Sequence, residues 1–450
     1  MEGPWYTVPT VLGISPGLHL TPAQALAREA RGYPHALRVL AAGREANARS
    51  SLELMGLRAR YGDELAVQVD MNRPGYEEAA RAYARSLEDR EGRLASRVVD
   101  IRLRLAVVGL GDDASRGLLR PLRDHPFVEI VGVASRSPRA AAALAAAGVP
   151  EGRYLAIGDG DVPDSFYRQA HVVYVGSPPW LHPEHTLGAI RNGAIAMTDK
   201  PLAPYPEDFA LLRKQAKGRD GLVFPFDHYL YKPAAQFARD QPDFLQGQQI
   251  TGLHGVLCEE RGKDRLPGGE RASWRLTPQA GGGVLMDLGS HLTNLATALF
   301  GVEFLGCEDL HRFDLYGGRF PEESGAVAAY RARTKEGREI PVTLRVAKGA
   351  AATEKVLRVE GEDGALELDF ARPEIRVTPL RSGEVRYRQD VSRYPDLTHL
   401  AFLDDVLEGP PLLDLEKAGK ALSPIWMAYA RGQDGPRGSR QDFDGGKRAA

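Results

Sequence analysis

Short apolar segments alternate with helix-like segments between residues 103 and 220 of this 450-residue chain. The apolar segments predict strands at 105–108, 128–134, 171–175 and 194–197. The segments between them predict helices at 117–123, 140–147 and 183–192. A helix between two strands returns the chain to the same edge of a sheet, so the strands run parallel. The pattern therefore predicts an α/β fold, a parallel sheet with helices on both faces, over residues 101–222.

A glycine-rich turn follows the first of these strands and precedes the first helix. It reads Gly-Leu-Gly-Asp-Asp-Ala, with Gly109, Gly111 and Ala114 at the three positions of the dinucleotide fingerprint. Glycines let the backbone approach a pyrophosphate, whose charge is stabilised at a helix N-terminus. The turn therefore predicts a Rossmann dinucleotide-binding domain. Asp112 and Asp113 stand where phosphate would approach, and they either cap the helix and point away or weaken binding.

The residues at the end of the second strand select between the two nicotinamide dinucleotides. NAD-binding domains use an acidic residue here to accept hydrogen bonds from the ribose hydroxyls. This chain has Ser135 and Arg136, a small hydroxyl and a guanidinium that suit a 2′-phosphate. We expect NADP as the cofactor and NAD as the second possibility, although an ordinary surface arginine would give the same sequence.

Two further loops end strands at the edge where ligands bind in such sheets. One contains Ser177, Pro178 and His182, and the other contains Lys200 before a proline. A lysine at a strand end can hold a substrate hydroxyl and favour its deprotonation. These four residues are candidates for contact with the cofactor, although either loop alone is also compatible with ordinary surface.

Three glycines at 281–283 lead into an apolar segment in which Asp287 and His291 lie four residues apart. That spacing places both side chains on one face of a helix. A carboxylate beside an imidazole can fix the histidine tautomer and tune its proton affinity near neutral pH. Such a pair alone is more often a solvated helix face, but the nucleotide loop and Lys200 upstream favour catalysis.

The order of these motifs resembles the Gfo/Idh/MocA oxidoreductases, which include glucose–fructose oxidoreductase and inositol dehydrogenase. The turn at Gly109 resembles the nucleotide loop of that family, and 177–182 resembles its Thr-Pro-Asn-x-x-His loop. Residues 199–201 resemble its Glu-Lys-Pro motif with Asp in place of Glu, and 281–291 resemble its Gly-Gly-Gly…Asp-x-x-x-His segment. The resemblance covers about 103–430 and leaves the first hundred residues unexplained.

The resemblance implies a catalytic group of Lys200, Asp287 and His291. In it, His291 would exchange the proton of the substrate hydroxyl, Asp287 would orient or share that proton, and Lys200 would position the oxygen. Hydride would pass between the carbinol carbon and the nicotinamide. Trp274 and Arg275 would contact the substrate. Asn294, where the family often has a second Asp, would also supply a polar contact.

The run Phe-Asp-His-Tyr-Leu-Tyr-Lys at 226–232 resembles a sequence of glucose-6-phosphate dehydrogenase in which His, Tyr and Lys hold the sugar phosphate. Imidazole, phenol and ammonium donors can surround a phosphate dianion. Asp227, His228, Tyr229 and Lys232 are therefore candidate substrate-binding residues. The alternative is a strand-to-helix junction with a buried tyrosine and an exposed lysine.

Three further regions complete the chain. Residues 1–100 predict an α-rich accessory module, with helices starting near 21, over about 34–57 and over 76–94, and a strand at 65–69. Residues 223–431 predict an α+β domain with a large open, mainly antiparallel sheet, because short turns join its strand-like segments. The exposed face of that sheet predicts a homodimer or homotetramer. The polar, glycine-rich tail 432–450 is expected to be disordered.

Composition excludes several classes of function. Lys plus Arg is 58 and Asp plus Glu is 60, so no global charge favours nucleic acid or an anionic membrane. No apolar run approaches the ~20 residues needed to span a bilayer. Two cysteines supply neither a disulfide framework nor a Cys-rich metal site, so no metal is predicted and a cytoplasmic location is expected.

The sequence predicts an NADP-dependent oxidoreductase that acts on a hydroxyl-bearing carbon of a sugar, sugar phosphate or cyclitol. A non-catalytic dinucleotide or sugar sensor with the same fold is the alternative, favoured by Asp112 and Asp113. The presence of Lys200, Asp287 and His291 together argues against it, because a sensor requires none of them. An accessory protein that docks through residues 1–100 is a third possibility.

Overall fold

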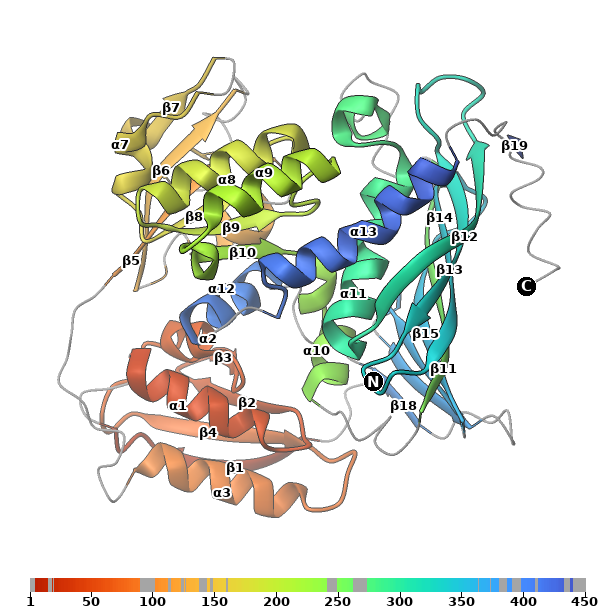
Figure 1. Cartoon of the computed structure of the whole chain (residues 1–450). Coiled ribbons are helices and arrows are strands. Elements are labelled where there is room, and N and C mark those ends of the chain that lie inside the picture. Colours follow the sequence, from red (N-terminus) through yellow and green to blue (C-terminus); the bar gives the residue numbers. More distant parts are fainter. Residues whose placement is uncertain are drawn as a thin grey trace.

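The computed structural model describes residues 5–14, 18, 20–89, 102–111, 115–122, 125, 127–136, 144–145, 149–158, 161–240, 249–261, 273–362, 364–372, 374–379, 387–390, 398–408, 412–432 and 438–439. Three β-sheets organise these residues: a four-stranded sheet near the N-terminus, a six-stranded sheet in the middle of the chain and a nine-stranded sheet in the C-terminal part. Figure 1 shows each sheet with its own helices.

The six-stranded sheet is parallel throughout, in the order β10-β9-β8-β5-β6-β7. Its strands are β5 (Leu103–Val108), β6 (Val128–Ser135), β7 (Tyr154–Ala156), β8 (Val172–Val175), β9 (Ile195–Asp199) and β10 (Val223–Phe226). The helices are η1 (Ser115–Leu119), α5 (Arg120–Leu122), η2 (Glu151–Arg153), α7 (Asp164–Arg168), η3 (Pro179–Leu181), α8 (His182–Arg191), α9 (Pro206–Ala216) and η4 (Asp220–Leu222). Runs of four buried residues at 105–108 and 172–175 form central strands because helices cover both faces. The predicted Rossmann fold is confirmed, while the helix predicted at 140–147 lies outside the described residues except for 144 and 145.

The nine-stranded sheet has the order β18-β17-β16-β15-β11-β14-β13-β12-β19. Its strands are β11 (Ile250–Glu260), β12 (Glu303–Asp314), β13 (Gly325–Arg333), β14 (Glu339–Ala350), β15 (Glu354–Gly361), β16 (Gly364–Asp369), β17 (Glu374–Pro379), β18 (Tyr387–Asp390) and β19 (Gly438–Ser439). The β11–β14 and β12–β19 pairs are parallel and the other pairs antiparallel, which confirms the mainly antiparallel sheet.

Helices of the C-terminal part pack on one face of this sheet and turn toward the Rossmann domain (Figure 1). The sheet contacts α10 (Pro233–Asp240), η9 (Leu285–Gly289), α11 (Ser290–Phe300) and α13 (Leu415–Arg431), and the other helices of this part are η5 (His228–Tyr231), η7 (Ser273–Leu276), η8 (Pro278–Ala280) and α12 (Thr398–Glu408). The turn η9 is π-helical and leads directly into α11, which is buried over its first eight residues. Helix α11 packs against β11 and α13, so the segment that carries the predicted catalytic residues lies inside the molecule.

The N-terminal module is more mixed than the α-rich module predicted from the sequence. Its elements are β1 (Trp5–Val11), α1 (Leu20–Arg31), β2 (Leu37–Ala41), β3 (Arg44–Asn47), α2 (Ser51–Gly56), β4 (Glu64–Asp70) and α3 (Tyr76–Glu88). The helix predicted over 34–57 is wrong, because β2 and β3 form a hairpin there and only α2 is helical. Strand β2 alternates buried and partly buried side chains, which is the period of a half-buried strand. The positive φ angles of Ala42 and Gly43 form the hairpin turn.

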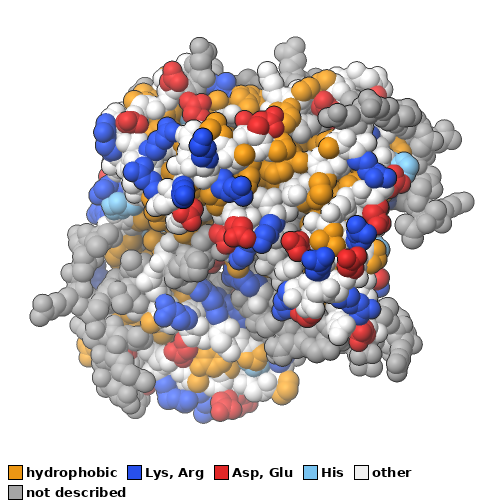
Figure 2. All heavy atoms as spheres, in the orientation of Figure 1, with side chains coloured by type: hydrophobic (Ala, Val, Ile, Leu, Met, Phe, Trp, Pro, Cys, Tyr) orange, Lys and Arg blue, Asp and Glu red, His pale blue; other side chains and the backbone are white. Residues whose placement is uncertain are grey.

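Helix α12 lies between the N-terminal module and the Rossmann sheet and packs on α2, η1 and η5 (Figure 1). Figure 2 shows acidic and basic side chains interspersed over the described part of one face, as the net charge of −2 suggests. Among the described residues, no helix combines the length and the apolar character needed to cross a membrane.

Candidate active site

The glycine turn lies at the carboxyl edge of the parallel sheet, beside the loop that follows β8. Gly109 has a φ of 84°, and a Cβ atom there would overlap the backbone of Ser177. Gly111 is exposed, and a Cβ atom there would meet nothing within 4 Å. The sequence therefore folds into a tight turn with open space on its outer side, which fits the approach of a dinucleotide pyrophosphate. Asp112, Asp113 and Ala114 lie outside the described residues.

The predicted nucleotide-selecting residues end β6 at the same edge. Ser135 is the last residue of the strand and is 4% exposed, while Arg136 follows it and is exposed. Parallel pairing of β6 with β5 brings this strand end next to the glycine turn. Arg136 therefore lies where the ribose end of a bound dinucleotide would reach in this fold.

The loop after β8 is fixed by two histidines. His182 is 1% exposed, with Nδ1 2.8 Å from the Pro201 carbonyl and Nε2 2.5 Å from the Ser177 carbonyl. His185, which the sequence analysis did not select, lies 2.9 Å from the Ser177 hydroxyl through Nδ1. Burial lowers the pKa of His182 to about 4. His182 therefore links the loop that contains Ser177 and Pro178 to the loop that contains Pro201. Its ring is buried between these loops, whereas the sequence predicted a contact with the cofactor.

Lys200 follows β9 and forms an ion pair with Asp287. Its Nζ lies 2.9 Å from Asp287 Oδ1 and also donates to the Asp287 carbonyl. Lys348 of β14 lies 3.2 Å from Asp287 Oδ2 and 2.9 Å from Oε2 of Glu259. Burial opposes ionisation of Asp287, but Lys200 and Lys348 hold its pKa well below the ordinary value. Asp287 is therefore a buried anion that holds two ammonium groups.

His291 pairs with Asp227 and not with Asp287, the partner expected from the sequence. Its Nδ1 lies 2.6 Å from Asp227 Oδ1, while Asn294 donates to Asp227 Oδ2 at 2.8 Å and the Tyr229 amide donates to Oδ1 at 2.9 Å. Asp227 is fully buried, so it is not placed to contact a substrate phosphate. His291 pairs with Asp227 because Asp227 directly follows β10 and lies beside α11. Asp287 is instead held by Lys200 and Lys348.

Burial also sets the protonation of this second pair. Burial lowers the pKa of His291, and the carboxylate of Asp227 only partly offsets that effect. The pKa of Asp227 is lowered because the His291 interaction outweighs the burial that opposes ionisation. His291 is therefore neutral near pH 7, with Nδ1 bonded to the carboxylate and Nε2 directed away from it.

The rest of the run at 227–232 surrounds His291 with aromatic rings. The ring of Tyr229 lies 4.4 Å from that of His291, and the ring of His228 lies 4.8 Å from it. Lys232 is partly buried, with its Nζ 5.1 Å from the Tyr229 ring centre. Burial lowers the pKa of His228 well below its usual value, which disfavours a cationic phosphate donor at that position. The structure thus brings the run to the site but turns Asp227 and Tyr229 toward His291.

Other predicted residues lie at the rim or behind the site. The Nε of Arg275 lies 3.9 Å from Asp287 Oδ1, and its side chain is one-third exposed. Asn294 is 3% exposed and bonded to Asp227, so it supports the His291 pair from behind. Trp274 lies within η7, and its side chain lies outside the described part of the chain.

A hydrogen-bond network between Tyr429, Glu323 and the start of η9 was not predicted from the sequence. The hydroxyl of Tyr429 donates to Glu323 Oε1 at 2.7 Å and accepts from the Gly283 and Met286 amides at 3.0 and 3.2 Å. Glu323 is fully buried, and a Cβ atom at Gly283 would overlap it. This contact explains why glycine occupies position 283. Tyr429 and Glu323 are 106 positions apart in the sequence, and Lys348 and Glu259 are 89 positions apart. No local sequence pattern therefore identifies either pair.

Asp227, His228 and His291 each offer one potential metal ligand atom, and these atoms lie within 4.8 Å of one another. Both oxygens of Asp227 accept hydrogen bonds, and His291 donates one of them. A metal would have to displace these donors, so the hydrogen-bonded arrangement accounts for the cluster.

Comparison with known protein families assigns the two larger parts of the chain. Residues 103–226 match the model described as the oxidoreductase family with an NAD-binding Rossmann fold, and residues 249–367 match the GFO/IDH/MocA C-terminal domain. The two matches together cover more than half of the chain. The protein therefore belongs to the Gfo/Idh/MocA family of NAD(P)-binding oxidoreductases that act on hydroxyl groups of sugars and cyclitols. Residues 10–88 match a different model, described as the PTS HPr component phosphorylation site.

Individual relatives match this chain over different lengths. The dTDP-3,4-didehydro-2,6-dideoxy-alpha-D-glucose 3-reductase of Streptomyces violaceoruber is 29% identical over 59% of this chain and 79% of its own length. The 1,5-anhydro-D-fructose reductase of Ensifer adhaerens is 35% identical over 30% of this chain and 37% of its own length. The scyllo-inositol 2-dehydrogenase (NADP(+)) of Bacillus subtilis is 26% identical over 29% of this chain and 35% of its own length.

Solved structures show the same fold at lower identity. Levoglucosan dehydrogenase in complex with NADH is 16% identical, has a TM-score of 0.61 and covers 75% of this chain and 100% of its own. A 3-ketoreductase from Actinomadura kijaniata in complex with TDP-benzene and NADP is 19% identical, with a TM-score of 0.57, and covers 75% of this chain and 98% of its own.

Proposed function

We propose that this oxidoreductase uses NADP and that His291, held by Asp227, exchanges the proton of the substrate hydroxyl. The observation that carries the proposal is the hydrogen bond from His291 Nδ1 to a fully buried carboxylate at 2.6 Å. With that bond made, the neutral imidazole presents the lone pair of Nε2 as a base. The proposed substrates are hydroxyl-bearing sugars, sugar phosphates or cyclitols. Nucleotide-linked sugars are included because the name of one relative contains a dTDP-sugar.

Lys200 completes the acid–base group. Its Nζ is bonded to Asp287, which lies four residues before His291 on the continuous η9–α11 segment. During oxidation of an alcohol, Nε2 of His291 takes the hydroxyl proton, and Lys200 stabilises the developing negative charge on oxygen. Asp287 holds Lys200 in place through their ion pair. During reduction, the imidazolium returns the proton to the same oxygen.

The residues present fit the nicotinamide cofactor. Open space beside Gly111 and the tight turn at Gly109 would hold the pyrophosphate, and Arg136 would hold the 2′-phosphate. The bound nicotinamide supplies or accepts the hydride. We expect a cytoplasmic enzyme, because the chain has only two cysteines, and a homo-oligomer, because side chains on β12 remain partly exposed.

The cofactor assignment is tested by fluorescence titration of NADPH and NADH against the wild-type protein and the Arg136→Ala variant. We expect wild type to bind NADPH more tightly and the variant to lose that preference, because the guanidinium pairs with the 2′-phosphate. Tighter binding of NADH by wild type would contradict the NADP assignment. Turnover is then measured with hexoses, hexose phosphates, inositols and nucleotide sugars. Cofactor binding with no turnover of any of them would favour a sensor.

A second function is proposed for the N-terminal module, because residues 10–88 match a family model described by a phosphorylation site. Phosphoryl transfer to a protein requires a nucleophile such as an imidazole. The module contains His19 and His35. His35 is 2% exposed, and burial lowers its pKa. We propose that His19, which lies outside the described residues, accepts the phosphoryl group.

This second proposal is tested with potassium phosphoramidate, a chemical donor that phosphorylates histidine. Intact mass should increase by one acid-labile phosphoryl group, and the increase should disappear in His19→Ala but persist in His35→Ala. Equal labelling of His19→Ala and wild type would exclude His19 as the acceptor.

A further inference from the structure

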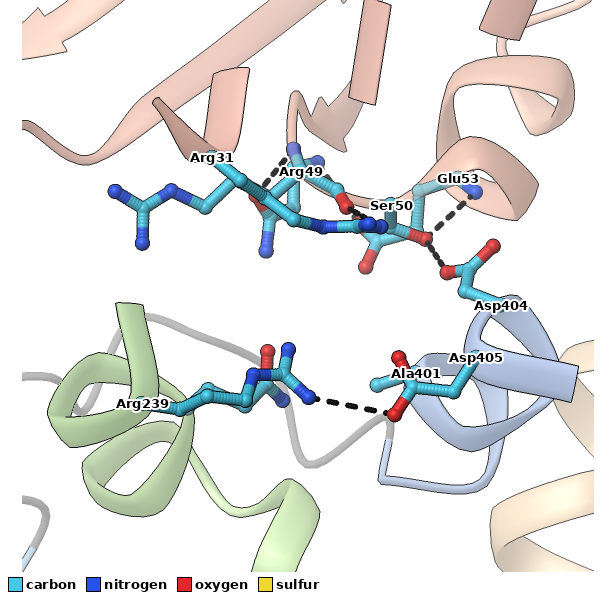
Figure 3. Close-up of a pocket in the computed structure, with 10 residues that line it drawn as sticks. Arg31, Arg49, Ser50, Glu53, Arg239, Ala401, Asp404 and Asp405 are labelled. Carbon is cyan, nitrogen blue, oxygen red and sulfur yellow. Dashed lines mark hydrogen bonds and ion pairs between the residues drawn. The ribbon is translucent and has the colours of Figure 1, made fainter. Parts of the chain in front are cut away.

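Two adjacent carboxylates on α12 connect different parts of the molecule. Asp404 binds the N-terminal module, whereas Asp405 binds η5 and α10, which lie next to the active site. Figure 3 shows Asp404 directed toward Ser50 and Asp405 directed toward Arg239 across a small cavity. The cavity measures about 30 Å³, room for about one water molecule, so side chains fill most of the junction.

Asp404 is the main polar contact of the module with α12. It is 2% exposed and accepts hydrogen bonds from the Ser50 hydroxyl at 2.5 Å, the Ser51 hydroxyl at 2.6 Å and the Leu52 amide at 2.8 Å. Hydrogen bonds to an ionised acceptor are about twice as strong as neutral ones. Loss of the acceptor would leave buried donors unsatisfied, which costs more than the bonds contribute. Two weaker contacts, Gln24 to the Leu407 carbonyl and His125 to the Leu52 carbonyl, flank the same junction.

Asp405 holds the other end of the segment that carries Asp227. The hydroxyl of Tyr231, the last residue of η5, donates to Asp405 Oδ2 at 2.7 Å, and Arg239 of α10 lies 3.3 Å from the same oxygen. Asp227 caps the start of η5 by accepting from the Tyr229 amide. The short segment η5 is therefore fixed by Asp227 and His291 at one end and by α12 at the other.

Aromatic packing makes the connection between α12 and this segment rigid. The ring of Phe402, from α12, lies 4.9 Å from that of Phe226 and 5.2 Å from that of Tyr231. His399 of the same helix lies 4.6 Å from Phe226, the residue before Asp227. A shift of α12 therefore displaces residues on both sides of Asp227.

We propose that α12 couples the N-terminal module to the active site, with Asp404, Asp405 and Tyr231 as positioning residues for the Asp227–His291 pair. The docked module holds Asp404, Asp404 fixes α12, and α12 holds η5 through Asp405 and Phe402. Loosening the module then loosens η5 and misplaces the carboxylate that orients His291. The kinetic part of this proposal rests on the function proposed for His291.

Hydrogen exchange tests the coupling without requiring turnover. The Leu230 and Lys232 amides are bonded within η5, to the carbonyls of Asp227 and Tyr229, so their exchange reports its opening. Asp404→Asn should speed exchange of the 228–232 segment by about 3- to 30-fold, the range of measured coupling effects. Glu45→Gln is the matched control, since Glu45 is a half-exposed module carboxylate whose ion-pair partner is Arg38 of the same module. Unchanged exchange in Asp404→Asn would overturn the coupling.

Kinetics separate positioning from a purely structural role. Asp404→Asn and the double variant Ser50→Ala/Ser51→Ala should each lower kcat by about 3- to 30-fold with little change in KM, and combining them should add nothing further. Tyr231→Phe should resemble them, with the acid limb of the pH profile shifted because His291 loses its fixed partner. If Asp404→Asn and Ser50→Ala/Ser51→Ala each lowered kcat and their effects multiplied in the combined variant, the proposal would be overturned. Faster exchange in a protein whose wild type shows no turnover would count against the proposed function alone.

Discussion

The two buried carboxylates of the active site, Asp227 and Asp287, have the same charge but opposite kinds of partner. Asp227 accepts from a neutral imidazole, an amide side chain and a backbone amide. Asp287 lies between two lysines and within 4 Å of an arginine. Both have lowered pKa values despite burial. In the proposed mechanism this difference is a division of labour, in which Asp227 orients the proton-transfer group and Asp287 holds the cation that stabilises the oxygen.

The largest effect is expected when the imidazole on the Asp227 side is removed. His291→Ala should lower kcat by about 10²- to 10⁴-fold, the usual contribution of a general base. His254→Ala is a suitable control, because His254 is half-exposed on β11 and outside the site. Steady-state assays in both directions, with circular dichroism to check the fold, measure the effect. Unchanged turnover in His291→Ala would remove the Asp227 pair from the mechanism.

A direct comparison of Asp227→Asn with Asp287→Asn should separate the two roles. Asp227 raises the pKa of His291, so Asp227→Asn should lower kcat by about 10- to 10³-fold and shift the acid limb of kcat/KM to lower pH. Asp287→Asn should leave that limb almost in place while still lowering kcat, because Lys200 loses its anchor and stabilises the transition-state oxygen less well. The pH dependence of kcat and kcat/KM is the measurement. Equal shifts of the limb in both variants would contradict the division of labour.

Local patterns in the sequence identified many of the residues in this comparison but not their pairing. Gly109, Lys200 and His291 could be found because each follows a recognisable strand or glycine turn. The pairing of His291 with Asp227 depends on how β10 lies beside α11, a contact over 64 positions in the sequence. The i,i+4 spacing with Asp287 suggested a local pair, but Lys200, which follows β9, and Lys348 of β14 hold that carboxylate.

The same limit explains which parts of the fold were predicted. The parallel sheet followed from buried apolar runs such as 105–108, whose period differs from that of a helix. The β2–β3 hairpin was missed because its residues also fit a helical pattern, and only the alternation at Leu37, Val39 and Ala41 distinguishes it. Lys348 and Glu259 could not be found, because β11 and β14 bring them together as parallel neighbours in the sheet.

A smaller effect, on the free energy of unfolding, should come from Glu259, which shares Lys348 with Asp287. Lys348 and Lys355 lower the pKa of Glu259 to about 2, although burial opposes ionisation. Because the pKa of Glu259 is lower in the folded state, the ionised carboxylate stabilises that state at pH values above the unfolded pKa of about 4.5. This stability is lost as the pH falls toward 2. Glu259→Gln should therefore cost about 2–3 kcal/mol at pH 7 and progressively less below pH 4.5. Urea unfolding at several pH values measures it, with the exposed Glu339→Gln as control. A difference from wild type that is independent of pH would contradict the ionic role.

The smallest effect should come from the amide that supports Asp227. Asn294 donates to Asp227 Oδ2, so Asn294→Ser should cost about 1 kcal/mol of stability by removing one buried hydrogen bond. The carboxylate would then rotate more freely, and kcat should fall about 5-fold, a loss of roughly 1 kcal/mol in transition-state stabilisation. Thr297→Val is the matched control one turn later on α11, because it removes the hydrogen bond to the Val302 carbonyl without touching Asp227. A fall in kcat as large in Thr297→Val as in Asn294→Ser would mean that general loosening of α11, and not the orientation of Asp227, limits proton transfer.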